Sequence, residues 1–112
     1  MSIKSQLLKG LLEGCVLEII SREETYGYKL TSDLNDYGFT ELNEGSVYPV
    51  LIRLEKKEFI TSQSKASPLG PKRKYFTINN NGRNFLKSFK GIWDDVSGTV
   101  DNIMKGGRIH EL

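Results

Sequence analysis

Residues 59–78 decide the fold of this chain, and their sequence is FITSQSKASPLGPKRKYFTI. This stretch is basic and contains no acidic residue, although the whole chain of 112 residues is nearly balanced, with 16 basic and 14 acidic residues. Its basic residues are Lys65, Lys72, Arg73 and Lys74. Strand-forming residues at 59–66 and 72–78 flank the turn-forming sequence Ser67-Pro-Leu-Gly-Pro, so the pattern predicts a basic β-hairpin that can hold phosphates.

The residues just before the hairpin have the apolar spacing of an amphipathic helix, from Val47 to Lys57. Its inward positions are Val47, Val50, Leu51 and Leu54. Asn43 is a good N-cap, but Pro49 then lies several residues inside the helix; with Ser46 as the cap, Pro49 falls in the permissive first turn. Helix, strand, basic turn and strand follow one another in the order of a winged-helix module.

Two further helices are predicted in the N-terminal part of the chain. Apolar residues recur at helical spacing from Ser5 to Arg22, which indicates one continuous helix. Gly10 and Gly14 within it either admit a neighbouring helix or are simply tolerated. Residues 26–34 form a short second helix, and Gly38 ends it.

A last helix is predicted from the cap-forming residues 79–82 to about Met104. Its apolar residues form two parallel rows, made by Phe85, Leu86, Phe89, Ile92, Trp93, Val96, Val100 and Ile103. Two rows with heptad-like spacing exceed what a single intramolecular contact requires, so we expect these residues to pair two copies of the helix. The tail at 105–112 contains two glycines and is predicted to fray.

Composition argues against several other classes of protein. No apolar run reaches the roughly 18 residues of a membrane span, and the N-terminal sequence lacks the layout of a signal peptide. Cys15 is the only cysteine and predicts a buried thiol in a reducing compartment, so we expect a cytoplasmic protein. His110 is the only histidine, and the sequence has no metal-ligand cluster, phosphate-binding glycine loop or nucleophile motif, which argues against an enzyme, a metal or a cofactor.

Several short segments of the chain match one known pattern in order and spacing. They are Leu8-Lys-Gly-Leu-Leu-Glu, Tyr26-Gly-Tyr, Leu42-Asn-Glu-Gly-Ser-Val-Tyr-Pro-Val-Leu-Ile-Arg-Leu-Glu, Gly70-Pro-Lys-Arg-Lys-Tyr-Phe, and Thr77 with Gly82. On these residues the sequence resembles the PadR family of bacterial transcriptional regulators, in its short subfamily, over nearly the whole chain. Two positions depart from the family pattern: Glu58 replaces the glycine that usually ends the recognition helix, and Ile78-Asn-Asn-Asn replaces a Leu-Thr-rich start of the last helix.

The resemblance implies a mainly α-helical fold with a small two-stranded β wing. Residues 1–78 are then a winged helix-turn-helix DNA-binding domain, and residues 79–112 are a C-terminal dimerisation helix with a short tail. Members of the family act as homodimeric repressors, bind double-stranded DNA at pseudo-palindromic operators, and are often released by small molecules. We therefore expect a transcriptional repressor with a small aromatic or drug-like effector.

The expected DNA contacts come from the second helix, the outer face of the third helix and the wing. They are Tyr26, Lys29, Ser46, Tyr48, Pro49, Ile52, Lys56, Lys72, Arg73 and Lys74. A helix presents its outer face to base edges in the major groove, and basic wing residues bind phosphates or reach the minor groove. In an alternating strand Lys72 and Lys74 share one face and Arg73 takes the other, so the three cannot hold one groove equally. Tyr26 fits core packing equally well.

Trp93 is the expected contact for an aromatic effector, because it lies near the predicted two-fold axis. In multidrug-binding relatives a tryptophan at the matching place stacks on planar ligands between subunits, and Leu8, Leu12 and Phe89 are candidate walls of such a pocket. Trp93 also fits a simple interface residue, since aromatic side chains are common in interfaces.

Two other functions stay open on the sequence. A winged-helix module can bind a protein partner through the same surface, and a salt titration of DNA binding separates this alternative from the first. The chain also fits a DNA-binding autoregulator without an effector, which the sequence does not separate from the main hypothesis. Arg53 and Glu55 lie on the third helix, but they match a family motif that indicates internal ion pairing, so they are not among the expected DNA contacts.

Overall fold

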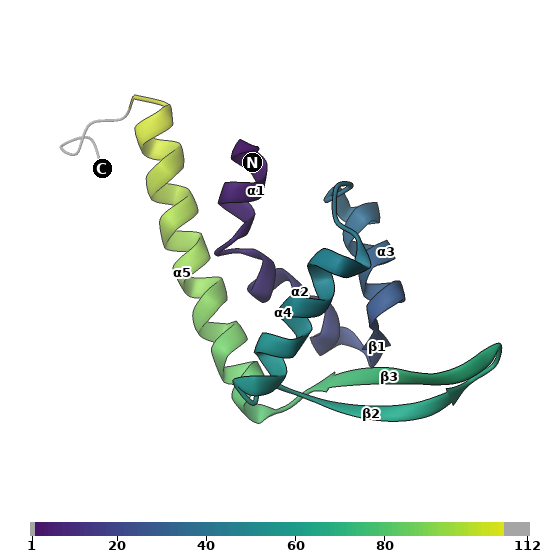
Figure 1. Ribbon diagram of the computed structural model, residues 1–112. Coiled ribbons are helices and arrows are strands. Elements are labelled where there is room, and N and C mark those ends of the chain that lie inside the picture. The colour runs from purple at the N-terminus through teal and green to yellow at the C-terminus, as the bar shows by residue number, and fades with distance from the viewer. Residues whose placement is uncertain (1, 107–112) are drawn as a thin grey trace.

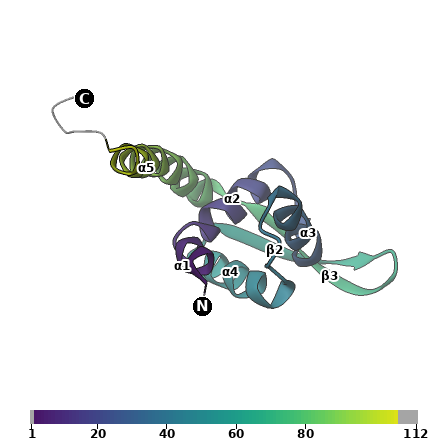
Figure 2. The ribbon, with the colours of Figure 1, turned by 90° about the horizontal axis from the view of Figure 1, so that it is seen from above.

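The computed structural model describes residues 2–106, which form five helices and three strands (Figure 1). In chain order these are α1 (Ile3–Leu8), α2 (Leu12–Arg22), β1 (Thr25–Tyr26), α3 (Gly27–Tyr37), α4 (Glu44–Lys56), β2 (Ile60–Ser67), β3 (Gly70–Ile78) and α5 (Asn80–Met104). Seen from above, α5 and the β2–β3 hairpin extend from opposite sides of the helical body (Figure 2). The expected fold class is confirmed, whereas His110 and most of the predicted frayed tail lie outside the described residues.

The predicted helix from Ser5 to Arg22 is wrong, because the structure divides it into α1 and α2. Residues 9–11 form a turn in which the Leu11 N–H donates to the Leu8 carbonyl. Gly10 lies in this turn, where its low helix propensity favours a break. The apolar spacing continues across the break, and spacing alone does not reveal that the chain changes direction.

The second helix was predicted one residue too early, because Tyr26 belongs to a strand. Thr25 pairs with Phe76 and Tyr26 with Tyr75, so β1 joins the wing in an antiparallel sheet of order β1-β3-β2. The sheet therefore has three strands where two were expected. A strand of two residues is too short to show an alternating pattern, so the sequence held no signal for it.

The core lies where α2, α3 and α4 meet the sheet and the first turns of α5. Its buried residues are Val16, Leu17, Ile20, Leu30, Leu34, Val47, Val50, Leu51, Leu54, Ile60, Phe76 and Leu86. The four predicted inward positions of α4 are all among them, which confirms the orientation of that helix. Cys15 was predicted to be buried but is half-buried beside this core, and burial raises the pKa of its thiol.

α4 begins at Asn43, whose side chain accepts a hydrogen bond from the Ser46 N–H at 3.0 Å. The Ser46 hydroxyl accepts from the Asn43 N–H at 3.0 Å, so the two residues form a capping box. Asn43 is thus the cap and Ser46 is not. Pro49 consequently lies inside the helix, where it lacks the N–H that would otherwise donate to the Gly45 carbonyl.

Glu58 follows the C-cap of α4 and adopts the left-handed conformation. It stands at the position where the resembled family usually has a glycine. Its φ is +62°, and it is the only non-glycine residue with positive φ within residues 2–106. The Glu58 N–H donates to the Glu55 carbonyl at 2.9 Å and the Phe59 N–H donates to the Leu54 carbonyl at 3.0 Å. These two bonds form a Schellman motif, so the turn keeps its geometry although its residue is unfavourable.

α5 is anchored by its first turns and then leaves the body. Asn79 caps it by accepting from the Gly82 N–H at 2.9 Å, and Phe85 stacks on Phe59 with ring centroids 4.7 Å apart. Gly82 packs against the carbonyl of Phe59, leaving no room for a side chain. None of the helices within residues 2–106 is long and apolar enough to cross a membrane.

Candidate nucleic-acid interface

The outer face of α4 is the surface on which contacts to DNA bases were predicted from the sequence. Its expected residues are all exposed: Ser46, Tyr48, Pro49, Ile52 and Lys56. Tyr48 keeps 47% of its surface exposed and Ile52 keeps 40%, whereas the apolar residues on the opposite face of the helix are buried. The face thus combines hydroxyl, aromatic, branched apolar and cationic groups on one rigid element.

Arg53 forms an ion pair within the protein, as predicted from the sequence. Its Nε donates to Glu13 of α2 at 3.0 Å, and Lys57 donates to the same carboxylate at 3.1 Å. Partial burial raises the pKa of Glu13, but these two hydrogen bonds and the charges of Arg53 and Lys57 outweigh it, so the pKa lies below its ordinary value. Arg53 on α4 and Lys57 at its C-terminus are therefore paired with a carboxylate of α2, and these ion pairs join α4 to α2.

Glu55 is also paired, and its partners join α4 to the wing. The Ser62 hydroxyl of β2 donates to one carboxylate oxygen, and Lys74 of β3 donates to the other at 3.2 Å. The Ser62 hydrogen bond, followed by Lys74, lowers the pKa of the Glu55 carboxyl, which stays ionised at neutral pH. Lys74, an expected phosphate contact, thus has a carboxylate partner in the free protein.

The other face of the wing holds Lys65 and Arg73, which are cross-strand neighbours. Lys65 pairs with Glu24 at 2.7 Å, and the Arg73 guanidinium lies 4.1 Å from the centroid of the Tyr26 ring. Tyr26 is half-buried and meets Tyr75 of the wing edge to face, but it is not among the residues that form or pack against the core, so its predicted alternative role in core packing is not confirmed. Lys72, one residue before Arg73, is exposed and forms no ion pair with any residue in 2–106.

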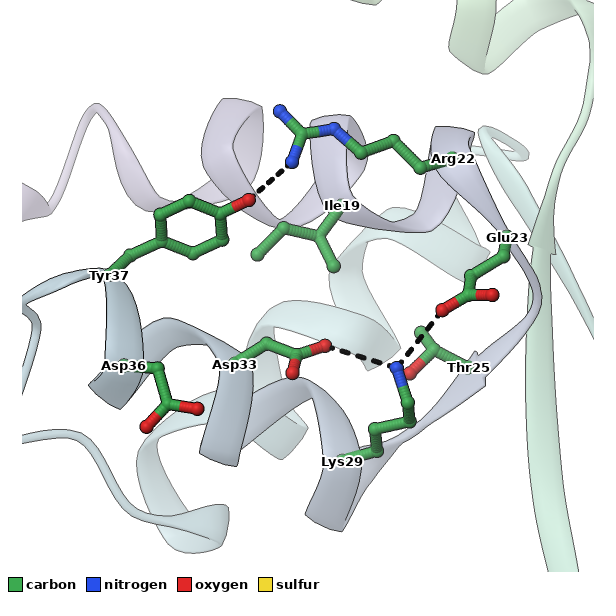
Figure 3. A pocket seen from close by; sticks show the side chains of 8 residues that line it. All are labelled: Ile19, Arg22, Glu23, Thr25, Lys29, Asp33, Asp36 and Tyr37. Carbon is green, nitrogen blue, oxygen red and sulfur yellow. Dashed lines mark hydrogen bonds and ion pairs between the residues drawn. The ribbon is translucent and has the colours of Figure 1, made fainter.

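Lys29, the expected backbone contact on α3, is held between two carboxylates (Figure 3). Its Nζ donates to Glu23 at 3.1 Å and to Asp33 at 3.3 Å. This arrangement was not predicted from the sequence, although Asp33 lies four residues after Lys29 at the spacing typical of helical ion pairs. Of the expected basic contacts, Lys56 and Lys72 are those without a carboxylate or aromatic partner in the described chain.

The apolar rows of α5 divide into a packed part and an exposed part. Leu86 is 6% exposed and lies in the core, and Phe85 packs on Phe59, so these two expected dimer contacts already pack within the chain. Phe89 is half-buried against Gly14. The remaining residues are exposed, namely Ile92, Trp93, Val96, Val100 and Ile103.

The expected pocket walls lie in three different elements. Leu8 of α1 and Leu12 of α2 are half-buried, like Phe89, whereas Trp93 is 44% exposed. α1 adds the exposed side chains of Ile3 and Leu7 close to the N-terminus. The exposed side chains of Ile3, Leu7 and Trp93 thus present apolar surface on α1 and α5.

Comparison with known proteins connects this geometry to a family. The model of the transcriptional regulator PadR-like family matches residues 16–88, which include α3, α4 and the whole wing. This chain belongs to that family. The PadR-like family is one of transcriptional regulators and not of enzymes, which confirms the expectation that the chain is not an enzyme.

Solved structures agree with the family model over most of the chain. A PadR-like transcriptional regulator from Bacillus cereus is 54% identical, with a TM-score of 0.80 over 88% of this chain and 96% of that chain. A Streptococcus transcriptional regulator is 44% identical, with a TM-score of 0.80 over 88% and 97% of the two chains. An uncharacterized protein from Lysinibacillus sphaericus is 29% identical over 106 residues, which are 93% of this chain and 97% of the relative.

Proposed function

We propose that this PadR-like regulator is a homodimeric, sequence-specific repressor whose α4 reads the major groove and whose wing holds the phosphate backbone. One observation supports the proposal. The outer face of α4 is exposed, and Lys56 and Lys72 form no ion pair within residues 2–106, whereas Arg53, Lys57, Lys65 and Lys74 each pair with a carboxylate. A cation without an intramolecular partner can bind a phosphate without first breaking an ion pair.

Each element of the surface has its own part in recognition. Tyr48 and Ile52 offer apolar contacts to thymine methyl groups, and the Ser46 hydroxyl can bond to a base edge or phosphate while it caps α4. Pro49 lies beside them on the same exposed face. In a two-fold dimer the two α4 helices enter successive major grooves about one helical turn apart, which suits a pseudo-palindromic operator.

Titration of the protein against duplex DNA at several salt concentrations tests this function. The logarithm of the affinity should fall steeply with the logarithm of salt concentration, and Lys72→Ala should reduce this slope by about one. Lys105→Ala is the matched control, because Lys105 is exposed and is the C-cap of α5, outside α4 and the wing. An affinity that does not change with salt would instead favour a module that binds a protein partner.

The dimer is proposed to form through the exposed part of the α5 rows, with a second copy of the chain as the partner. Val100→Asp places a charge in this row and should shift the protein to monomers in sedimentation velocity. Gly98→Asp is its control, because Gly98 lies on the opposite side of α5 and an added Cβ there meets nothing within 4 Å. Equal association of both variants would place the dimer interface elsewhere.

Trp93 is proposed to stack on a small aromatic effector between the two copies of α5. Binding that favours one angle between subunits changes the half-site spacing and thereby the affinity for the operator. Since Trp93 is the only tryptophan, its fluorescence reports occupancy directly. Quenching by planar aromatic compounds with release of the operator supports an effector, and unchanged operator affinity at saturating compound indicates a regulator without one.

A further inference from the structure

The loop between β2 and β3 carries an apolar side chain at the outer end of the wing (Figure 1). Leu69 keeps 91% of its surface exposed, more than any other large apolar residue within residues 2–106. An exposed leucine is common on protein surfaces and needs no function by itself. Its place is informative here, because Leu69 lies at the tip of the hairpin that the proposed function brings to DNA.

The turn around Leu69 is held in one shape. Ser67 pairs with Gly70 across the hairpin, so Pro68 and Leu69 alone form the loop. The Ser67 hydroxyl donates to the Pro71 carbonyl at 3.0 Å, and Gly70 has a φ of +143°, a conformation that favours glycine. Pro68 fixes its own φ. Burying Leu69 against a partner therefore requires little further ordering of the backbone.

Most basic residues of the wing lie closer to the helical body than this tip and have partners there. Lys65 and Lys74 each pair with a carboxylate, and Arg73 lies over an aromatic ring. Residues 66–71 contain no charged side chain. Lys72, directly after them, is exposed and forms no ion pair within the part of the chain that the structure describes. The outer end of the wing is thus an uncharged turn with one available cation at its edge.

The minor groove of B-DNA suits such a tip. The groove is about 6 Å wide, so a narrow turn with one large side chain fits it better than a helix does. Proteins that bind this groove insert leucine or proline side chains between the bases and combine them with basic residues. Lys72 can bind a phosphate at the edge of the groove while Leu69 lies inside it.

An apolar contact in this groove also gives a preference among base pairs. Guanine presents an amino group there, at N2, whereas A·T pairs present only the acceptors adenine N3 and thymine O2. The amino group projects into the groove, where a leucine would meet it and leave its N–H without an acceptor. Leu69 therefore fits a groove floor of A·T pairs better than one that contains G·C pairs.

We propose that Leu69 enters the minor groove beside each half-site that α4 reads and selects A·T pairs there. Lys72 binds a phosphate at the edge of the same groove. The inference rests on the proposed DNA-binding function and adds to it a residue that determines specificity outside α4.

Fluorescence anisotropy with labelled duplex DNA tests this role. The probes carry the site that the wild-type protein recovers from a pool of randomised duplexes, flanked by A·T, G·C or inosine·cytosine pairs. Inosine lacks the amino group of guanine, so its pair with cytosine resembles G·C in the major groove and A·T in the minor groove. Wild type should bind the A·T and inosine probes equally within about twofold and the G·C probe at least about fivefold more weakly. Equal affinities for the G·C and inosine probes would overturn the proposal.

Two variants of Leu69 separate the apolar side chain from the fold. Leu69→Ser should bind the three probes with affinities within about twofold of one another, because its side chain no longer fills the groove. Leu69→Met keeps a large apolar side chain and should keep the preference against G·C. Both variants should unfold at the wild-type temperature, since Leu69 is exposed. A wild-type preference in Leu69→Ser would overturn the role of Leu69.

Salt dependence separates failure of this inference from failure of the proposed function. Leu69→Ser should leave the slope of log affinity against log salt unchanged, whereas Lys72→Ala should lower it by about one and keep the preference against G·C. A steep slope in wild type without any preference among the flanking pairs would leave DNA binding in place and overturn the role of Leu69. Failure of the wild-type protein to bind any duplex would overturn both.

Discussion

The ring of Phe89 on α5 lies directly against the backbone of Gly14 on α2, with no room between them for a methyl group. The contact is reinforced by Lys90, which pairs with Glu18 of α2 at 2.6 Å. One of the two sequence interpretations of Gly14 is thereby confirmed, because the glycine admits a neighbouring helix. The large apolar side chains of α5 after this contact are exposed, so the Gly14–Phe89 contact, together with the Phe59–Phe85 stack, orients the proposed dimerisation surface.

Replacing Gly14 by alanine should destabilise the fold. Overpacking costs about 1–3 kcal/mol and the gain in helix propensity returns about 1 kcal/mol, so the free energy of unfolding should fall by up to about 2 kcal/mol in urea denaturation. Gly91→Ala on α5 is the control, because a Cβ there meets nothing within 4 Å. That variant should gain about 1 kcal/mol, and similar effects of both changes would show that Phe89 moves aside freely.

Glu58→Gly should stabilise the protein. A non-glycine residue in the left-handed region costs about 1–2 kcal/mol, of which the greater freedom of glycine in the unfolded chain cancels roughly 0.5–1 kcal/mol. We expect thermal denaturation to show a net gain of about 0.5–1 kcal/mol. Glu58→Ala removes the same side chain but keeps the unfavourable conformation, so it should show no gain; a gain of equal size would trace the effect to the carboxylate.

Glu55→Gln should increase the salt dependence of DNA binding. In the free protein Lys74 is paired with Glu55, so binding a phosphate requires Lys74 to leave this carboxylate. Glutamine keeps a hydrogen-bond acceptor for Ser62 but removes the charge, which releases Lys74 and should raise the slope of log affinity against log salt by up to about one. A weaker complex with an unchanged slope would mean that the Glu55–Lys74 pair holds the wing in its DNA-binding position.

The ion pairs of Glu13 should stabilise the fold at neutral pH and not in acid. Because the pKa of Glu13 in the folded protein lies below its ordinary value of 4.5, the unfolded chain binds the proton more readily. Its contribution is therefore complete above pH 4.5 and is lost as the pH falls below this value through the folded pKa. Glu13→Gln should be less stable than wild type at neutral pH and should converge with it in acid.

Asp95→Asn is the control for this comparison, because Asp95 is exposed on α5 and forms no ion pair within residues 2–106. Chemical denaturation at a series of pH values gives the two stability curves. A difference between Glu13→Gln and wild type that stays constant from neutral pH into acid would show that the Glu13 side chain acts through packing and not through its charge.

Much of the fold follows from neighbours along the chain. The inward face of α4, the cap at Asn43, the cap at Asn79 and the basic hairpin rest on periodicity and on turn chemistry, which act over a few residues. The break between α1 and α2 does not follow from neighbours along the chain, because it depends on the direction in which the two helices pack. The strand at Tyr26 does not either, because it forms only by pairing with β3.

The sequence by itself determined which side chains form the candidate site, since exposure on α4 and the charge of the wing are local properties. Only the tertiary structure decided which cations are available. Lys74 meets Glu55 across 19 positions of sequence, Lys65 meets Glu24 across 41, and Arg53 meets Glu13 across 40. Packing of the core brings such partners together. A basic residue with no acidic residue near it in the sequence is therefore often paired with a carboxylate in the folded protein.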